Sequence, residues 1–227
     1  MLAPSHWMML TNLADSAVLA PAALAIAIWL GASRAWRLAT LWCALFGVGV
    51  VMVAATKIAF IGWGLGVRSL NFTGISGHTM LATAVYPTIL WLVLQRYRPA
   101  VRNTGAALGL LFGVVVGLSR LVLHAHSPSE VVAGCLWGAV VSIGFIALSQ
   151  LRSLPALHPL MFVCSLLLIG AVLYGTRAPS QRLIIRTALA LSGHHEPYIR
   201  VTWRMRGTGR NQPAHAAPVC RDGLSGT

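Results

Sequence analysis

Long apolar segments separated by short polar loops occupy the first 175 residues of the chain. Such a segment can cross a membrane as a helix when it holds about 20 mainly apolar residues. We predict six helices of this kind, over Leu13–Leu30, Leu38–Gly62, Ser76–Gln95, Thr104–Leu123, Pro128–Gln150 and Leu157–Tyr174. The pattern therefore predicts an all-α fold, a polytopic transmembrane helical bundle of about six spans.

Arginines in the loops orient this bundle. The loops after the first, third and fifth segments contain Arg34, Arg37, Arg96, Arg98, Arg102 and Arg152. Cytoplasmic loops are enriched in Lys and Arg, so we place these loops in the cytoplasm and the N-terminus outside. Residues 1–12 contain no Lys or Arg, which favours a retained first span over a cleaved signal peptide. We expect a multi-pass protein of the plasma (inner) membrane.

Composition excludes several other classes of protein. The chain is 57% hydrophobic and only 9% charged, which is too apolar for a soluble globular protein of 227 residues. The net charge is +13, but the basic residues are scattered over loops and a tail, so we expect no nucleic-acid binding. The four cysteines lack metal-ligand spacing and predict neither a zinc site nor a disulfide framework.

The chain divides into a transmembrane domain, residues 1–175, and a basic tail, residues 176–227, that we expect to be largely disordered. Within the tail, Gln181–Leu191 has the pattern of an interfacial amphipathic helix, whereas Gly207–Thr227 has the composition of disorder. The cluster His194-His195-Glu196 is more typical of solvated residues than of a metal site.

Acidic residues and lysines are rare. The acids are Asp15, Glu130, Glu196 and Asp222, and Lys57 is the single lysine. An ionisable residue at a membrane boundary is costly without a partner, so each is a candidate functional residue. Asp15 has two interpretations, as a cap of the first helix or as a partner of a cation in a site.

Under the predicted topology, several polar side chains meet on the outer side of the membrane. They are Lys57, Arg68, His78, Arg120, His126 and Glu130. The segment Ser76-Gly77-His78 begins the third helix, where unpaired N–H groups favour an anion.

A repeat of glycines at Gly105, Gly109, Gly113 and Gly117 predicts that the fourth helix packs closely against a neighbouring helix.

These residue types fit phosphoryl transfer. Three cations and the N–H groups near Ser76 and Gly77 would surround the phosphate oxygens. His126 would attack phosphorus, with Glu130 fixing its tautomer. His78 would protonate the departing oxygen and then help to activate water. This scheme needs no metal ligands and no cofactor.

The motifs resemble those of the PAP2 (type 2 phosphatidic acid phosphatase) superfamily. Residues 57–130 carry the resemblance, with its second motif at Ser76, Gly77 and His78 and its third at Ser119, Arg120 and His126. It implies a PAP2/acid phosphatase-like core. In the family the matching residues serve as phosphate ligands (Lys57, Arg68, Ser76, Gly77, Arg120), general acid (His78) and nucleophile (His126).

This sequence departs from the family pattern at three places. Lys57 and Arg68 stand farther apart than in the family's first motif, and no proline follows Arg68. Ile75 replaces a proline, and Glu130 replaces an aspartate.

We expect a metal-independent phosphatase that acts on a lipid phosphate or lipid diphosphate at the outer leaflet through a phosphohistidine intermediate. The alternatives are a non-catalytic transporter, a lipid-phosphate-binding protein of the same fold, or an enzyme that transfers phosphate to an acceptor other than water. The sequence leaves the identity of the lipid and the oligomeric state open.

Overall fold

The computed structural model describes residues 4–150, 159–176 and 178–207 of the chain. Nearly all of its regular structure is helical, and the described residues form no β-strand, which confirms the all-α prediction. The helices are α1 (Pro4–Leu13), α2 (Ser16–Ala32), α3 (Trp36–Trp63), the short 3-10 helix η1 (Arg68–Leu70), α4 (Gly77–Val93), α5 (Pro99–Val122), α6 (Pro128–Gln150), α7 (Pro159–Leu173), α8 (Ser180–Ser192) and α9 (Arg200–Gly207).

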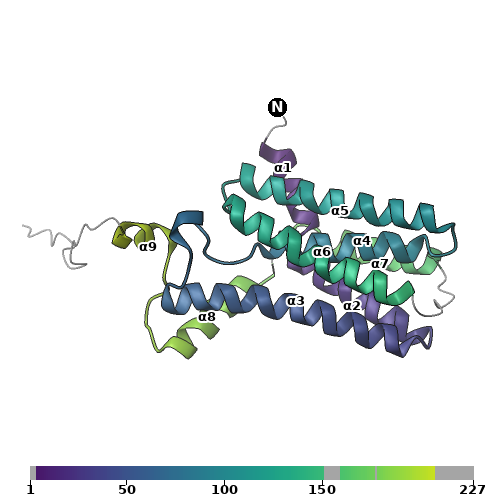
Figure 1. The fold of residues 1–227 in the computed structure, drawn as a ribbon, viewed down its shortest axis with the longest axis horizontal. Helices are drawn as coiled ribbons and strands as arrows, with labels where there is room; N and C mark the ends of the chain where they lie inside the picture. The colour runs from purple at the N-terminus through teal and green to yellow at the C-terminus, as the bar shows by residue number, and fades with distance from the viewer. Residues whose placement is uncertain (1–3, 151–158, 177, 208–227) are drawn as a thin grey trace, which may run out of the picture.

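Four stretches of the described residues are long and apolar enough to cross a membrane, namely residues 6–32, α3, α5 and α6. They form the bundle of a multi-pass membrane protein (Figure 1). The prediction of about six spans is not confirmed, because α4 and α7 have only 17 and 15 residues.

The first predicted helix, Leu13–Leu30, corresponds to α2, and a further helix, α1, precedes it. The chain breaks at Ala14–Asp15, and α1 packs separately against α5, where Oγ1 of Thr11 lies 2.7 Å from Oγ of Ser119. Asp15 is the N-cap of α2, and its carboxylate accepts a hydrogen bond from the N–H of Ala17 at 2.8 Å. A capping aspartate with extended backbone starts a new helix, which is one of the two interpretations of Asp15 from the sequence.

Helix α4 lies at the centre of the bundle and is largely buried between α5 and α6. Glycines permit this close contact. A Cβ atom added at Gly109 of α5 would lie 2.6 Å from Cα of Pro87, and one at Gly134 of α6 would lie 2.8 Å from the carbonyl oxygen of Ser76. The glycine repeat of α5 therefore serves close helix packing, as predicted.

Large apolar side chains also cover much of the outside of the bundle. Examples on α3, α5 and α6 are Val51, Leu111, Leu136 and Val140, all of which are exposed. Such exposure would be unfavourable in water but is expected where side chains contact lipid.

Residues 178–207 differ from the largely disordered tail expected from the sequence. Helix α8 lies beside α3, over the range where an amphipathic helix is predicted, and α9 lies at one end of the bundle near η1 (Figure 1). The N–H of Tyr198 donates to the carbonyl of Ile61 at 2.9 Å, and Trp203 is buried against Phe60. These contacts hold the segment in place. Residues 208–227 lie outside the described residues.

Candidate active site

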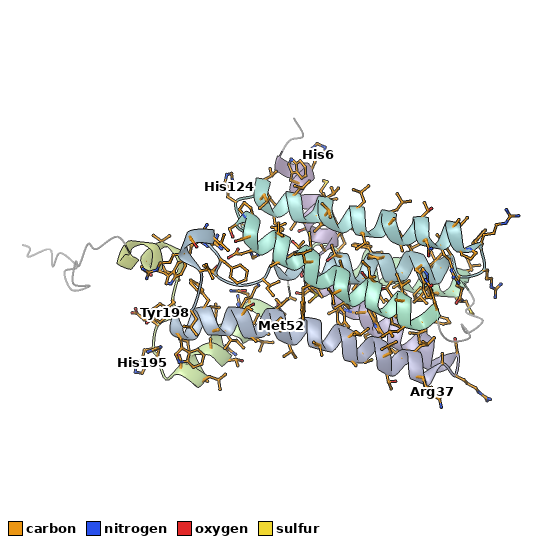
Figure 2. All side chains as sticks on the ribbon, in the orientation of Figure 1. His6, Arg37, Met52, His124, His195 and Tyr198 are labelled. Carbon is orange, nitrogen blue, oxygen red and sulfur yellow. The ribbon has the colours of Figure 1, made fainter. Side chains whose placement is uncertain are left out.

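A cavity of about 620 Å³ opens where α3, α4, α5 and the C-terminal segment meet. Figure 2 shows two of its lining residues, His124 and Tyr198, at the end of the bundle opposite Arg37. Its charged and polar lining residues are Lys57, Thr73, His78, Arg120, His124, His126, Gln181, Tyr198 and Arg200. The structure therefore brings both predicted histidines and two predicted cations to one cavity.

His126 is held by Glu130 in the first turn of α6. Nδ1 of His126 lies 2.7 Å from Oε2 of Glu130, whose side chain is fully buried. The same oxygen accepts the N–H of Ser127 at 3.2 Å, so Glu130 reaches back to the residue before Pro128 as in a capping box. The local sequence Ser127-Pro128-Ser129-Glu130 thus starts the helix and positions the carboxylate under the imidazole.

This contact fixes the protonation of the ring. An ionised carboxylate only accepts hydrogen bonds, so Nδ1 of His126 must carry the proton and Nε2 keeps its lone pair. Burial lowers the pKa of His126 below its usual value, although the hydrogen bond to Glu130 acts in the opposite direction. A neutral imidazole with a free Nε2 lone pair is a nucleophile.

Glu130 has two further partners from outside its helix. Oε1 accepts hydrogen bonds from the N–H of Thr73 at 2.8 Å and from its hydroxyl at 2.6 Å. Nη2 of Arg200 lies 2.6 Å from the same oxygen and 2.7 Å from Oε2. A buried carboxylate is tolerated because it is paired and hydrogen-bonded in this way.

His78 lies in the first turn of α4 and faces a different carboxylate. Its Nε2 is 3.5 Å from Oδ2 of Asp15. Asp15 also caps α2 and accepts a hydrogen bond from the N–H of Ala178 at 3.4 Å. The capping interpretation of Asp15 is therefore confirmed, and the same side chain also contacts a histidine of the cavity.

Lys57 and Arg120 supply positive charge without a hydrogen-bonded counter-ion. Neither has a hydrogen-bond partner among the residues that the structure describes, and Nε of Arg120 is a buried atom. A Cβ atom added at Gly77 would lie 3.9 Å from Nζ of Lys57, which places the ammonium group beside the start of α4. Two cations with unused donors at one cavity favour binding of an anion.

Ser76 and Gly77 lie at the start of α4, beside His78, and neither is among the lining residues of the cavity. The side chain of Ser76 is buried and bonds to Thr79 at 2.9 Å, while its N–H donates to the carbonyl of Glu130 at 3.1 Å. The N–H of Ser76 is therefore engaged within the protein. The N–H groups of Gly77 and His78 in the first turn have no partner within the helix and remain suited to an anion.

Arg68 is a predicted phosphate ligand that lies on an outer surface of the protein and not in the cavity. It is exposed in η1, does not line the cavity, and its guanidinium carbon lies 5.3 Å from the centre of the Trp203 ring. The structure thus leaves Arg68 out of the group formed by Lys57, Arg120 and the two histidines.

Sequence reasoning missed Thr73 and Arg200 as members of the site. Thr73 lies in the connection between α3 and α4, and its residue type gave no signal. Arg200 is one of several arginines in the tail, and nothing in its spacing distinguishes it. No group of three or more His, Cys, Asp or Glu side chains within residues 4–150, 159–176 and 178–207 is arranged to hold a metal ion.

Comparison with known proteins yields one family and one relative. The model of the PAP2 superfamily matches residues 62–154. An uncharacterized 22.5 kDa protein in the cps region of Klebsiella pneumoniae is 39% identical over 200 residues, which cover 86% of this chain and 96% of that protein. No solved structure matches the chain.

Proposed function

The chain belongs to the PAP2 superfamily, and from this membership we propose that it removes phosphate from a lipid phosphate or lipid diphosphate at the outer leaflet. Membership supports a phosphatase. The observation that carries the proposal further is one cavity lined by His126, His78 and two cations, Lys57 and Arg120, that have no hydrogen-bond partner among the described residues.

The reaction has two steps. In the first, Nε2 of His126 attacks phosphorus and forms a P–N bond while the P–O bond to the lipid breaks, and His78 gives its proton to the departing oxygen. In the second, water attacks the phosphohistidine, His78 accepts a proton from the water, and the P–N bond breaks to release inorganic phosphate. Glu130 stabilises the positive charge on His126 while the P–N bond exists.

Lys57 and Arg120 bind the non-bridging oxygens of the phosphate, together with the first N–H groups of α4. Charge that spreads over these oxygens in the transition state is stabilised by donors already in place. These protein cations supply the positive charge that the scheme requires, so we propose a reaction without a metal ion.

A second, apolar cavity supports a lipid as the substrate. It has a volume of about 690 Å³ and lies between α2, α4, α5 and α7. Leu13 and Val18, two of its lining residues, flank Asp15, whose carboxylate faces His78. A hydrocarbon chain in this cavity would therefore lie close to the catalytic histidine.

The test is release of phosphate by the purified protein in detergent, with a chelator present. The panel contains phosphatidic acid, phosphatidylglycerophosphate, an isoprenyl diphosphate and a lipid A phosphate. We expect release from at least one lipid, and a fall of roughly 10³-fold or more in His126→Ala because the nucleophile is removed. Release that survives this substitution would reject the mechanism, and binding without release would favour a non-catalytic protein of the same fold.

A further inference from the structure

Arg200 lies in the cavity although it comes from the C-terminal segment, well outside residues 57–130. Its side chain lines the cavity together with Lys57, Arg120 and His126. Its Nη2 atom contacts both carboxylate oxygens of Glu130 and lies 2.9 Å from Oγ1 of Thr73. The guanidinium of Arg200 therefore lies beside the carboxylate that holds His126, the proposed nucleophile.

The backbone that carries Arg200 is firmly anchored. Trp203, one helical turn later, is only 4% exposed, and its indole N–H donates to the carbonyl of Gly64 at 2.8 Å. On the other side of Arg200, the N–H of Tyr198 donates to the carbonyl of Ile61. These two bonds fix the segment against the C-terminal end of α3 and thereby hold the guanidinium of Arg200 in the cavity.

Glu130 does not need Arg200 to satisfy its oxygens. A carboxylate offers about four lone-pair sites. Four other donors already point at it: Nδ1 of His126, the N–H of Ser127, and the N–H and hydroxyl of Thr73. The contact with Arg200 thus adds charge pairing to hydrogen-bond sites that are already filled, and Glu130 stays hydrogen-bonded when the guanidinium also contacts another anion.

Arg200 also has donors to spare. Its hydrogen bonds to described residues all use Nη2, whereas a guanidinium carries five N–H groups spread over three nitrogens. The donors on Nη1 and Nε therefore stay open to the oxygens of a phosphate, which Arg binds in a forked geometry.

Arg68, in η1, contacts the same anchoring residue that holds α9 and Arg200. Arg68 stacks over the Trp203 ring and lies outside the cavity, whereas Arg200 lies inside it. Arg68 thus supports the anchor from which Arg200 reaches the site.

From these contacts we propose that Arg200 is the third cation of the phosphate site, in the place that the sequence motif assigns to Arg68. This inference rests on the proposed function only in taking the bound anion to be a phosphate group. Arg200 binds a non-bridging oxygen of the substrate and of the released phosphate, opposite Lys57 and Arg120.

The test is binding of inorganic phosphate to the purified full chain in detergent, measured by titration calorimetry, which requires no turnover. We expect Arg200→Ala to weaken binding by about tenfold or more. Arg200→Lys keeps the charge but loses the fork, so its affinity should lie between the two. The matched control is Arg186→Ala, which removes the same charge from an exposed position of α8 and should change affinity by less than about twofold.

Three outcomes would overturn the proposal. The first is an unchanged phosphate affinity in Arg200→Ala, and the second is a larger loss of affinity in Arg68→Ala than in Arg200→Ala. The third is faster lipid hydrolysis in Arg200→Ala, which would mean that Arg200 blocks access to the site. If the alanine variant fails to fold, Arg200→Gln retains hydrogen bonding to Glu130 and should show the same weakening.

The two proposals fail separately. A wild-type protein that binds phosphate through Arg200 but releases none from any lipid would keep this inference and reject the phosphatase. If the wild-type protein hydrolyses lipid phosphate but Arg200→Ala leaves phosphate affinity unchanged, the phosphatase is kept and the role of Arg200 is rejected.

Discussion

His126 and His78 each lie beside a carboxylate, but the two pairs are built differently. His126 and Glu130 are four residues apart and 2.7 Å from each other, and Glu130 is fully buried. His78 and Asp15 come from different helices, lie 3.5 Å apart, and leave 17% of the Asp15 side chain exposed. One pair is short, local and enclosed, and the other is long, tertiary and partly open to solvent.

The difference matches the two roles in the proposed reaction. A nucleophile attacks through one nitrogen and needs a single tautomer throughout, which a short buried hydrogen bond enforces. A group that gives a proton in one step and takes it back in the next must change its own charge, and a longer contact with a partly hydrated partner permits this. The strength of each carboxylate contact therefore follows what its histidine must do.

The largest effect is expected from breaking the tighter pair. In Glu130→Gln the amide loses the charge that stabilises the imidazolium and can present its NH₂ group to Nδ1, which favours the wrong tautomer. We expect kcat to fall by roughly 10³-fold or more with little change in KM. Steady-state kinetics on a lipid phosphate would measure this.

The matched control for that variant is Glu196→Gln, which removes the same charge from an exposed residue and should stay within about twofold of wild type. A Glu130→Gln enzyme with near-normal kcat would show that the tighter pair is structural only.

A smaller effect is expected from the looser pair. Asp15→Asn removes the charge beside His78 but keeps a good N-cap for α2, so the helix is preserved. We expect kcat on a lipid phosphate to fall about tenfold, below the 10²- to 10⁴-fold typical of losing a general acid itself. On p-nitrophenyl phosphate, whose leaving group needs no proton, the fall should nearly vanish. An equal loss on both substrates would mean that Asp15 acts through folding and not through His78.

The smallest effect is a shift of the acid limb of the kcat/KM profile to lower pH. His126 attacks only when neutral, and burial lowers its pKa, so it stays neutral to a lower pH than an ordinary histidine. The acid limb of the kcat/KM profile should therefore have its midpoint below pH 6.5. Glu130 raises the pKa of His126, so the limb should move lower still in Glu130→Gln.

The substrate phosphate also ionises, with a pKa of about 6. Its effect is the same for both proteins, so the difference between the two acid-limb midpoints reports on His126. A limb that moves to higher pH in Glu130→Gln would contradict the assignment of His126.

What could be predicted from the sequence was local or periodic. The pairing of His126 with Glu130 depends on one turn at a helix start, and the glycines of α5 recur every four residues on the face that meets α4. Such features are set by neighbours along the chain, so spacing alone identifies them.

What could not be predicted depends on packing between distant segments. Asp15 reaches His78 only because the chain breaks before α2, and Arg200 reaches Glu130 only because Trp203 docks α9 near η1. The predicted count of six spans is not confirmed, because only four stretches of the described residues are long and apolar enough to cross a membrane. Helix α4 begins at Gly77, one residue after the predicted start, and ends at Val93, two residues before the predicted end at Gln95.

The ion pair between Arg200 and Glu130 joins positions 70 residues apart, which has a consequence for biosynthesis. A ribosome delivers both histidines, Lys57 and Arg120 to the membrane well before it reaches Arg200. The nascent protein thus passes through a stage in which its helices can already assemble while one wall of the cavity is still being translated. The cavity is therefore complete only when α9 has been synthesised and has docked, which is later than insertion of the spans.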